Sequence, residues 1–217
     1  MDTFTTVFPL ATPTERETLS QMEACVIGCG ALGAQAALIL ARMGLGYMTL
    51  IDGGMYTAQH ILSDICATTE TLGQGKAQVL GSAVAAANPT MLLRVLPVNL
   101  VLQNAGDLLP NHDVILDCSG SLQVCELLST QSQTPVIAVS ATAVTGRIRI
   151  QRPGESGNDA PPCEDESAPS PFSAAILASL AGYEAIKLLI KQDALPSGTA
   201  LQLDMNDYCL TRAPLQR

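Results

Sequence analysis

Three glycines and one aspartate have the residue types and the spacing of a nucleotide site. Gly28, Gly30 and Gly33 form the pattern G-x-G-x-x-G, and Asp52 closes the apolar run that follows. In this pattern the first glycine permits a tight turn, the second lets backbone approach a phosphate, and the third lets a helix pack closely on a strand. An aspartate in this position can accept a hydrogen bond from a ribose hydroxyl. The alternative is a nucleotide-binding fold without its ligand.

These residues need a strand before the glycines and a helix after them. The apolar patterning predicts a strand over residues 24–28, a helix over 31–43 and a second strand over 47–52. The first N–H groups of such a helix, at Ala31 and Leu32, have no acceptor within the helix, and the helix dipole makes this end attractive to phosphate. We therefore expect Ala31 and Leu32 to join the three glycines in binding the nucleotide.

The composition indicates one α/β domain over residues 1–217. Hydrophobic residues make up 47% of the chain but aromatic residues only 3%, so the core must be aliphatic. Buried parallel strands have this character, because both of their faces are covered. The N-terminus lacks the pattern of a secretory signal and no apolar run reaches the length of a membrane span, so no membrane partner is expected.

The net charge and the cysteines restrict the possible partners and the cellular compartment. The net charge is −9 and the basic residues form no cluster, which argues against nucleic acid as a partner. Scattered cysteines without a C-x-x-C pair favour a reducing, cytoplasmic setting with neither a disulfide framework nor a zinc site. The seven cysteines are Cys25, Cys29, Cys66, Cys118, Cys125, Cys163 and Cys209.

The rest of the chain continues the alternation of strands and helices. An arm over 1–22 carries a short helix near 14–22, with Thr14 and Glu17 at the spacing of a capping box. Residues 146–152 alternate apolar and charged side chains, as in a strand with one wet face. Residues 153–171 are acidic and poor in large aliphatic residues, and we expect a flexible loop. Further helices are predicted over 76–87, 122–130 and 172–191, and further strands over 92–97, 113–118, 135–141 and 200–213, the last as a strand or hairpin. This alternation predicts a Rossmann-like, mostly parallel sheet flanked by helices, with a C-terminal helix and a strand or hairpin extension.

Three further segments resemble the ThiF/MoeB/HesA family of ubiquitin-activating-like adenylyltransferases. They are GQGKAQVLGSAVAAANP (73–89), DVILDCSGS (113–121) and SPFSAAILASLAGYEAIKLLI (170–190). Together with the glycine turn, the resemblance extends over residues 24–205. The Gly-Gln-x-Lys block with its following Asn-Pro, and the late helix with its Gly-Tyr-Glu-Ala-Ile-Lys run, are the specific parts, because a plain dehydrogenase has no use for either.

The resemblance implies ATP as the cofactor and a ubiquitin-fold sulfur-carrier protein ending in Gly-Gly as the partner. The carrier carboxylate would attack the α-phosphate, pyrophosphate would leave, and the product would serve cofactor biosynthesis of the thiamine or molybdopterin type. Lys76 matches the lysine that contacts the phosphates and is our candidate catalytic residue; otherwise it is an ordinary exposed lysine. Asp117, Cys118 and Ser119 end a strand at the carboxyl edge, where ligands of open sheets bind, although Asp117 can instead cap the next helix. A homodimer is also implied.

Several positions depart from the family pattern. Where an Asp-x-Asp is usual, Asp52 is followed by two glycines, and the asparagine and arginine of the next block are His60 and Ser63. Gly120 replaces the acid that binds magnesium, so magnesium is doubtful, and the zinc-binding cysteine pairs are absent. His60 is expected to be a solvated loop residue; alternatively, it replaces the missing polar contact. Cys163 lies among acids that raise a thiol pKa, which argues against an activated nucleophile.

These departures leave two alternatives to an active adenylyltransferase. One is a pseudoenzyme that acts as a carrier-binding or partner subunit, favoured by the missing arginine and magnesium acid. The other is an oxidoreductase using NAD, in which Asp52 would select the unphosphorylated ribose. No residue of the sequence is a confident catalytic base for the oxidoreductase.

Overall fold

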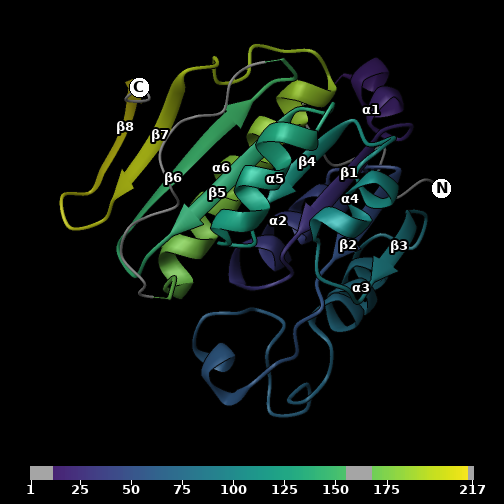
Figure 1. Ribbon diagram of the computed structural model, residues 1–217, viewed down its shortest axis with the longest axis vertical. Helices are drawn as coiled ribbons and strands as arrows, with labels where there is room; N and C mark the ends of the chain where they lie inside the picture. The colour runs from purple at the N-terminus through teal and green to yellow at the C-terminus, as the bar shows by residue number, and fades with distance from the viewer. Residues whose placement is uncertain (1–11, 155–167, 215–217) are drawn as a thin grey trace.

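The computed structural model describes residues 12–154 and 168–214. Within them eight strands form one sheet in the order β3-β2-β1-β4-β5-β6-β7-β8, in which β3 to β5 are parallel and β6, β7 and β8 are antiparallel (Figure 1). The strands are β1 (Glu23–Ile27), β2 (Tyr47–Ile51), β3 (Leu92–Leu96), β4 (Val114–Asp117), β5 (Val136–Ala141), β6 (Thr145–Gln151), β7 (Thr199–Asp204) and β8 (Cys209–Pro214). The strand order reverses direction between β1 and β4, and open sheets of this type bind ligands at that point, beyond the carboxyl ends of the strands.

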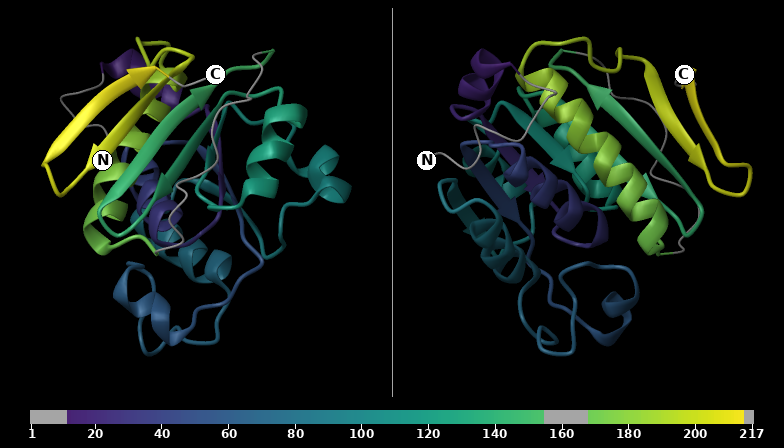
Figure 2. Two further views of the ribbon diagram at one scale, coloured as in Figure 1. Left: turned by 60° about the vertical axis from the view of Figure 1, so that its left-hand side comes forward. Right: turned by 180° about the vertical axis from the view of Figure 1, so that it is seen from behind.

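Helices cover both faces of the parallel part of the sheet. One face carries α2, α3 and α6, and the other carries α4 and α5 (Figures 1 and 2). The helices are α1 (Pro13–Leu19), α2 (Ala31–Arg42), α3 (Lys76–Ala87), α4 (Leu102–Leu108), α5 (Leu122–Gln131) and α6 (Pro171–Leu189), with a 3₁₀ turn η1 (Ala58–Leu62). The segment between β2 and α3, which contains η1, projects from the carboxyl edge of the sheet (Figure 1).

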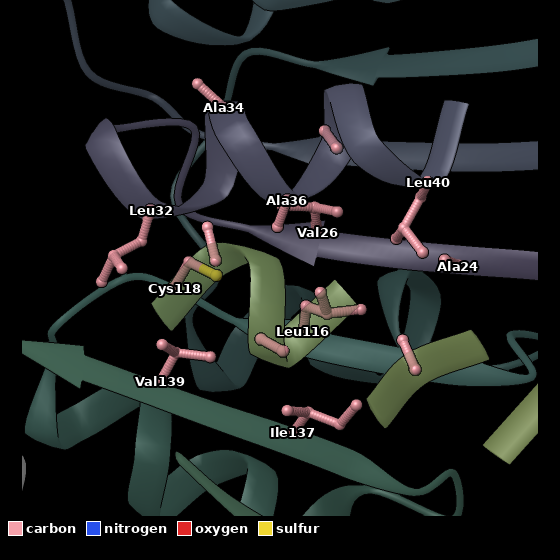
Figure 3. Packing of buried hydrophobic residues seen from close by; sticks show 14 of the residues in the cluster. Ala24, Val26, Leu32, Ala34, Ala36, Leu40, Leu116, Cys118, Ile137 and Val139 are labelled. Carbon is pink, nitrogen blue, oxygen red and sulfur yellow. The ribbon is translucent and has the colours of Figure 1, made fainter. Parts of the chain in front are cut away.

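The core is aliphatic, as the composition predicts. Ala24 and Val26 of β1 face the α2 side of the sheet, whereas Cys25 and Ile27 face α4 and α5, so the strand is buried on both faces after Glu23. Figure 3 shows small and branched side chains of α2, such as Ala36, beside the strands they cover. Close packing also joins α2 to α6, where a Cβ at Gly182 would lie 3.1 Å from Cγ2 of Ile39. The predicted α/β architecture is confirmed, with helix and strand ends within a few residues of those expected.

Three details of the sequence analysis are wrong. The N-cap of α1 is Thr12, which pairs with Glu15, two residues before the expected Thr14, because Pro13 suits the first helical position. The face of β6 that was expected to be wet buries Arg149 to 7% exposure, and its guanidinium donates to Sγ of Cys125 on α5. An apolar helix long enough to span a membrane does exist, namely α6.

Packing explains why α6 is so apolar. Over half of its most apolar stretch, 56%, is buried inside the protein, against α2 and the sheet. The buried side of α6 includes Ala174, Leu177, Ala178 and Ala181, whereas Phe172 near its start is 68% exposed. This pattern is that of the core helix of a folded domain. Most of the expected loop over 153–171, including Cys163, lies outside the described residues.

Candidate functional site

The glycine turn has the geometry that each glycine was expected to provide. Gly28 has φ +87°, and a Cβ there would lie 2.7 Å from the backbone of Cys118 at the end of β4. A Cβ at Gly33 would lie 1.8 Å from the carbonyl oxygen of Gly28, so helix α2 can approach the turn only without a side chain. The turn is thus wedged between β1, β4 and α2, which fixes its backbone in space.

Asp52 braces this turn. Its Oδ2 accepts a hydrogen bond from the N–H of Cys29 at 2.7 Å, and its Oδ1 accepts from the N–H of Gly54 at 2.6 Å. Each carboxylate oxygen can accept more than one hydrogen bond, so both keep capacity for a ligand hydroxyl. The strand-end acid therefore holds the middle residue of the glycine turn and also faces the adjoining cavity.

A cavity of about 680 Å³ opens at the carboxyl ends of β1, β2 and β4, beneath α4 and α5. Its volume is within the range of small-molecule and cofactor sites. Of the predicted site residues, Gly28, Asp52 and Ser119 line it. The remaining wall is largely apolar, with Val98, Leu100, Val101 and Leu127, and carries the polar groups of Asn99, Gln123 and Glu126. This combination suits a flat base and a ribose.

Asp117 and Cys118 lie behind this wall. Asp117 is 5% exposed, and its Oδ1 accepts from both the N–H and the hydroxyl of Ser119, at 3.1 and 2.7 Å. The cap of α5 is Ser121, whose Oγ accepts from Val124 N. Asp117 thus shapes the strand end, and Ser119 is the residue of this group that reaches the cavity.

On the other side of the glycine turn lies the N-terminus of α2. Its N-cap is Gly30, which offers no side chain to cap the helix, and the first turn contains no acid. A Cβ at Gly30 would meet nothing closer than Nζ of Lys76 at 3.9 Å and Oδ2 of Asp64 at 4.0 Å. The first N–H groups of α2, at Ala31 and Leu32, therefore begin beside an open space with a lysine on its border.

Backbone pairing places Lys76 there. The N–H of Lys76 donates to Gly54 O at 2.9 Å, and Tyr56 pairs with both Gln74 and Gly73. The start of α3 is thereby tied to the chain that leaves β2. As a result Nζ of Lys76 lies 3.1 Å from Nε2 of His60.

This lysine–histidine contact joins two donors. Nδ1 of His60 accepts the N–H of Thr57 at 2.9 Å, so the neutral ring carries its proton on Nε2. Burial, together with the Lys76 ammonium, lowers the pKa of His60 and keeps the ring neutral. An ammonium and an imidazole N–H cannot satisfy each other, whereas an anionic oxygen between them accepts from both. His60 is only half-buried, but it is a member of this cluster rather than a solvated loop residue.

Sequence reasoning missed Tyr56 and Asp64. Asp64 is 4% exposed, and its Oδ1 accepts from Cys66 N at 3.0 Å and from the Tyr56 hydroxyl at 3.4 Å. The Tyr56 hydroxyl is also 3.4 Å from the carbonyl oxygen of Cys29, which links Asp64 to the glycine turn. Oδ2 of Asp64 has no hydrogen-bond partner among the described residues, and burial raises the pKa of this carboxyl.

Comparison with known proteins places this chain in a family. The profile of the ThiF family matches residues 5–217. The chain belongs to the ThiF family. The resemblance seen in the sequence motifs is therefore confirmed, and the glycine turn and Lys76 are parts of a ThiF-family fold.

Two curated relatives from Escherichia coli illustrate the relationship. The chain is 26% identical over 205 residues to a protein named molybdopterin-synthase adenylyltransferase, covering 87% of this chain and 81% of the relative. It is 28% identical over 188 residues to one named sulfur carrier protein ThiS adenylyltransferase, covering 80% and 74%. The solved structure of Escherichia coli MccB with ATP shares the fold with a TM-score of 0.83 at 15% identity, and this chain spans 94% of its own length and 66% of that chain.

The ThiF-family resemblance raises the question of which residues fit a divalent cation. At Gly120, where the family pattern has an acid, φ is +66° and no atom lies within 4 Å of a Cβ position. Oδ1 of the neighbouring Asp117 is already engaged by Ser119. Over residues 12–154 and 168–214, no three His, Cys, Asp or Glu residues gather into a protein-only metal site. Among the described residues, the buried carboxylate oxygen without a hydrogen-bond partner is instead Oδ2 of Asp64, across the glycine turn.

The two specific motifs of the resemblance have structural roles in this ThiF-family chain. Asn88 of the Asn-Pro pair donates to Ala41 O and Leu45 O at the end of α2. Glu184 of the late helix is 5% exposed, accepts from Leu195 N at 2.7 Å and pairs with Lys187 at 2.6 Å. These residues hold the scaffold together far from the cavity.

Proposed function

We propose that this chain binds ATP and uses it to adenylate the C-terminal glycine carboxylate of a small ubiquitin-fold sulfur carrier. The observation that carries the proposal is the pair of features that flank the glycine turn. A nucleoside-sized cavity with Asp52 lies on one side, and the N-terminus of α2 with Lys76 lies on the other. The names of the curated relatives support the same reaction.

Different residues would bind the base, the ribose and the triphosphate in such a reaction. The base would occupy the apolar cavity, and Asp52 would accept from the ribose. The triphosphate would cross Gly28 and Gly30 and meet the N–H groups of α2, Nζ of Lys76 and Nε2–H of His60. Donors fixed before the ligand arrives stabilise phosphate charge without reorganisation.

In the chemical step, a carboxylate oxygen of the carrier forms a bond to the α-phosphorus. The bond from that phosphorus to the bridging oxygen of the β-phosphate breaks, and pyrophosphate leaves with the electron pair. The products are a carrier acyl-adenylate and pyrophosphate. Lys76 is proposed as the catalytic residue because its ammonium can stabilise the negative charge that develops on the leaving phosphates.

The test combines ATP calorimetry with ATP–pyrophosphate exchange, each with and without carriers that end in Gly-Gly. The diagnostic variant is Lys76→Met, and the matched control is Lys191→Met, at an exposed lysine after α6. Loss of one preorganised charge contact is expected to lower exchange about 10²–10³-fold in Lys76→Met, and the control should keep the wild-type rate. If no ATP–pyrophosphate exchange occurs either with or without the carriers, adenylation is refuted.

A second candidate is a non-catalytic, carrier-binding subunit. Gly120 and Ser63 favour it, because each replaces a charged residue of the family pattern. ATP binding without exchange, with any carrier offered, would support this reading. Binding of NADH in place of ATP would favour the oxidoreductase alternative instead.

The proposal also includes an oligomeric state and a cellular compartment. A homodimer working in the cytoplasm is proposed from the family resemblance. The six cysteines within the described residues are all free thiols, which is consistent with a reducing compartment. Sedimentation in the presence and absence of ATP tests the dimer.

A further inference from the structure

Asp64 holds a buried carboxylate with one unsatisfied oxygen. Its side chain is fixed through Oδ1 by Cys66 N and the Tyr56 hydroxyl, and it is 4% exposed. Oδ2 makes no hydrogen bond within the described residues. Buried polar atoms are nearly always satisfied, so an unpaired carboxylate oxygen calls for an explanation, such as a ligand or ion that it binds.

The position of Oδ2 indicates what kind of ligand it could bind. Oδ2 of Asp64 and Nζ of Lys76 lie at 4.0 and 3.9 Å from the same point, the Cβ position of Gly30 at the start of α2. A nucleotide phosphate in this space would be attracted by Lys76, by Nε2–H of His60 and by the α2 N–H groups. Asp64 would repel it, because both groups are anionic, unless a cation lies between them.

We propose that Oδ2 of Asp64 is the protein ligand for the divalent cation that enters with the phosphates of ATP. Magnesium in nucleotide sites is commonly held by one or two carboxylates and by the phosphates, and it keeps several waters. A single fixed carboxylate oxygen beside a phosphate space meets that requirement. Asp64 would thereby supply, from the segment after β2, the acid that is missing at Gly120 after β4.

This inference rests on the proposed function, since the cation is brought by ATP. Tyr56 and Cys66 act as positioning groups, because they engage Oδ1 and so direct Oδ2 toward Gly30. When bound, the cation would neutralise phosphate charge, while Lys76 and His60 serve the remaining phosphate oxygens.

The experiment measures ATP affinity by calorimetry in EDTA and in Mg²⁺ for the wild type and for Asp64→Asn. Mn²⁺ binding to the protein–ATP complex is then followed by electron paramagnetic resonance, where free Mn²⁺ gives the signal. The control is Asp207→Asn, at an exposed aspartate in the turn between β7 and β8.

For the wild type and Asp207→Asn, Mg²⁺ should tighten ATP binding at least tenfold. Asp64→Asn should bind ATP in EDTA as well as the wild type or better, because the repulsion is gone. It should lose the Mg²⁺ enhancement, and Mn²⁺ should bind its ATP complex at least tenfold more weakly than that of the wild type. Asp64→Gln is a second neutral variant should Asp64→Asn fail to fold, and it carries the same expectation.

The outcomes separate the two proposals. A wild type that binds no ATP in either buffer overturns the proposed function and the cation site with it. A wild type that binds ATP, with full Mg²⁺ enhancement and Mn²⁺ affinity retained by the neutral variants, overturns only the cation site. In that case Asp64 is a protonated hydrogen-bond donor or a structural acid, since an amide can replace either.

Discussion

Substitutions at two glycines of one turn should separate ligand binding from stability. A Cβ at Gly33 would lie 1.8 Å from the carbonyl oxygen of Gly28, and backbone cannot yield at that distance without moving α2. A Cβ at Gly30 would have its nearest neighbour, Nζ of Lys76, at 3.9 Å, which is an ordinary van der Waals contact, and the φ of −83° suits any residue. The same addition of carbon atoms is thus a clash within the fold at one site and an obstacle to a ligand at the other.

The expected magnitudes differ accordingly. Gly33→Ala would severely overpack the contact between α2 and the glycine turn, and it should lower the free energy of unfolding by about 3 kcal/mol. For a chain of this size that corresponds to a Tm lower by roughly 6–12 °C. Gly30→Val should cost about 1 kcal/mol or less, because it alters an N-cap that has no side-chain hydrogen bond. Its branched side chain fills the space over the α2 N-terminus, so ATP affinity should fall at least tenfold.

Thermal unfolding by circular dichroism and ATP titration by calorimetry measure both quantities on the same samples. Gly106→Val, at a glycine of α4 whose Cβ position is open, controls for valine in place of glycine. Wild-type ATP affinity in Gly30→Val would show that phosphate does not cross Gly30. A Gly33→Ala protein as stable as the wild type would refute the packing argument for the third glycine.

Three further predictions concern the scaffold and the thiols. Asn88→Ala leaves carbonyls at the end of α2 unpaired and should lower stability by about 2–3 kcal/mol, seen as a Tm drop of roughly 4–12 °C with ATP binding unchanged. Glu184→Ala breaks a buried ion pair and a hydrogen bond and should cost about 3 kcal/mol in urea unfolding, whereas the exposed Glu17→Ala should cost almost nothing. Burial raises the pKa of Cys66 to about 11, so its reactive thiolate forms only as the pH approaches that value, and iodoacetamide at pH 8 should label the exposed Cys209 well before Cys66 in peptide mapping. Equal labelling of the two in folded protein would contradict the burial of Cys66.

Much of the fold could be read from local pattern. The helix over 76–87 has the bounds that the sequence predicts, and Asn88-Pro89 is the signal that ends it. Strands buried on both faces are continuous apolar runs, and β1, β2 and β4 were found for that reason. The error at α1 arose because Thr12 and Thr14 both have a glutamate three residues on, and only Pro13 distinguishes them.

The candidate site was predictable only in part. The glycines and Asp52 carry local signals, since each occupies a fixed place in a strand–turn–helix unit. Tyr56 and Asp64 come from a segment without hydrophobic period, and their burial depends on pairing with residues 73–76 and on contact with Cys29. Arg149 was expected on a wet strand face because alternation shows which side a residue faces but not which helix covers it.

The unsatisfied groups beside the Cβ position of Gly30 explain one another. Lys76 faces a second donor, and Asp64 has an oxygen without a partner, yet within the described residues these opposite charges form no ion pair. Backbone contacts place the lysine at the start of α3, where Nζ lies beside His60, and Tyr56 with Cys66 holds the acid through Oδ1. Keeping two opposite charges apart in a partly dry site costs stability, and such a cost is typical of sites arranged for a ligand that carries both signs. A phosphate chain with its divalent cation is a ligand of this kind, because its anionic oxygens suit Lys76 and His60 while its metal suits Asp64.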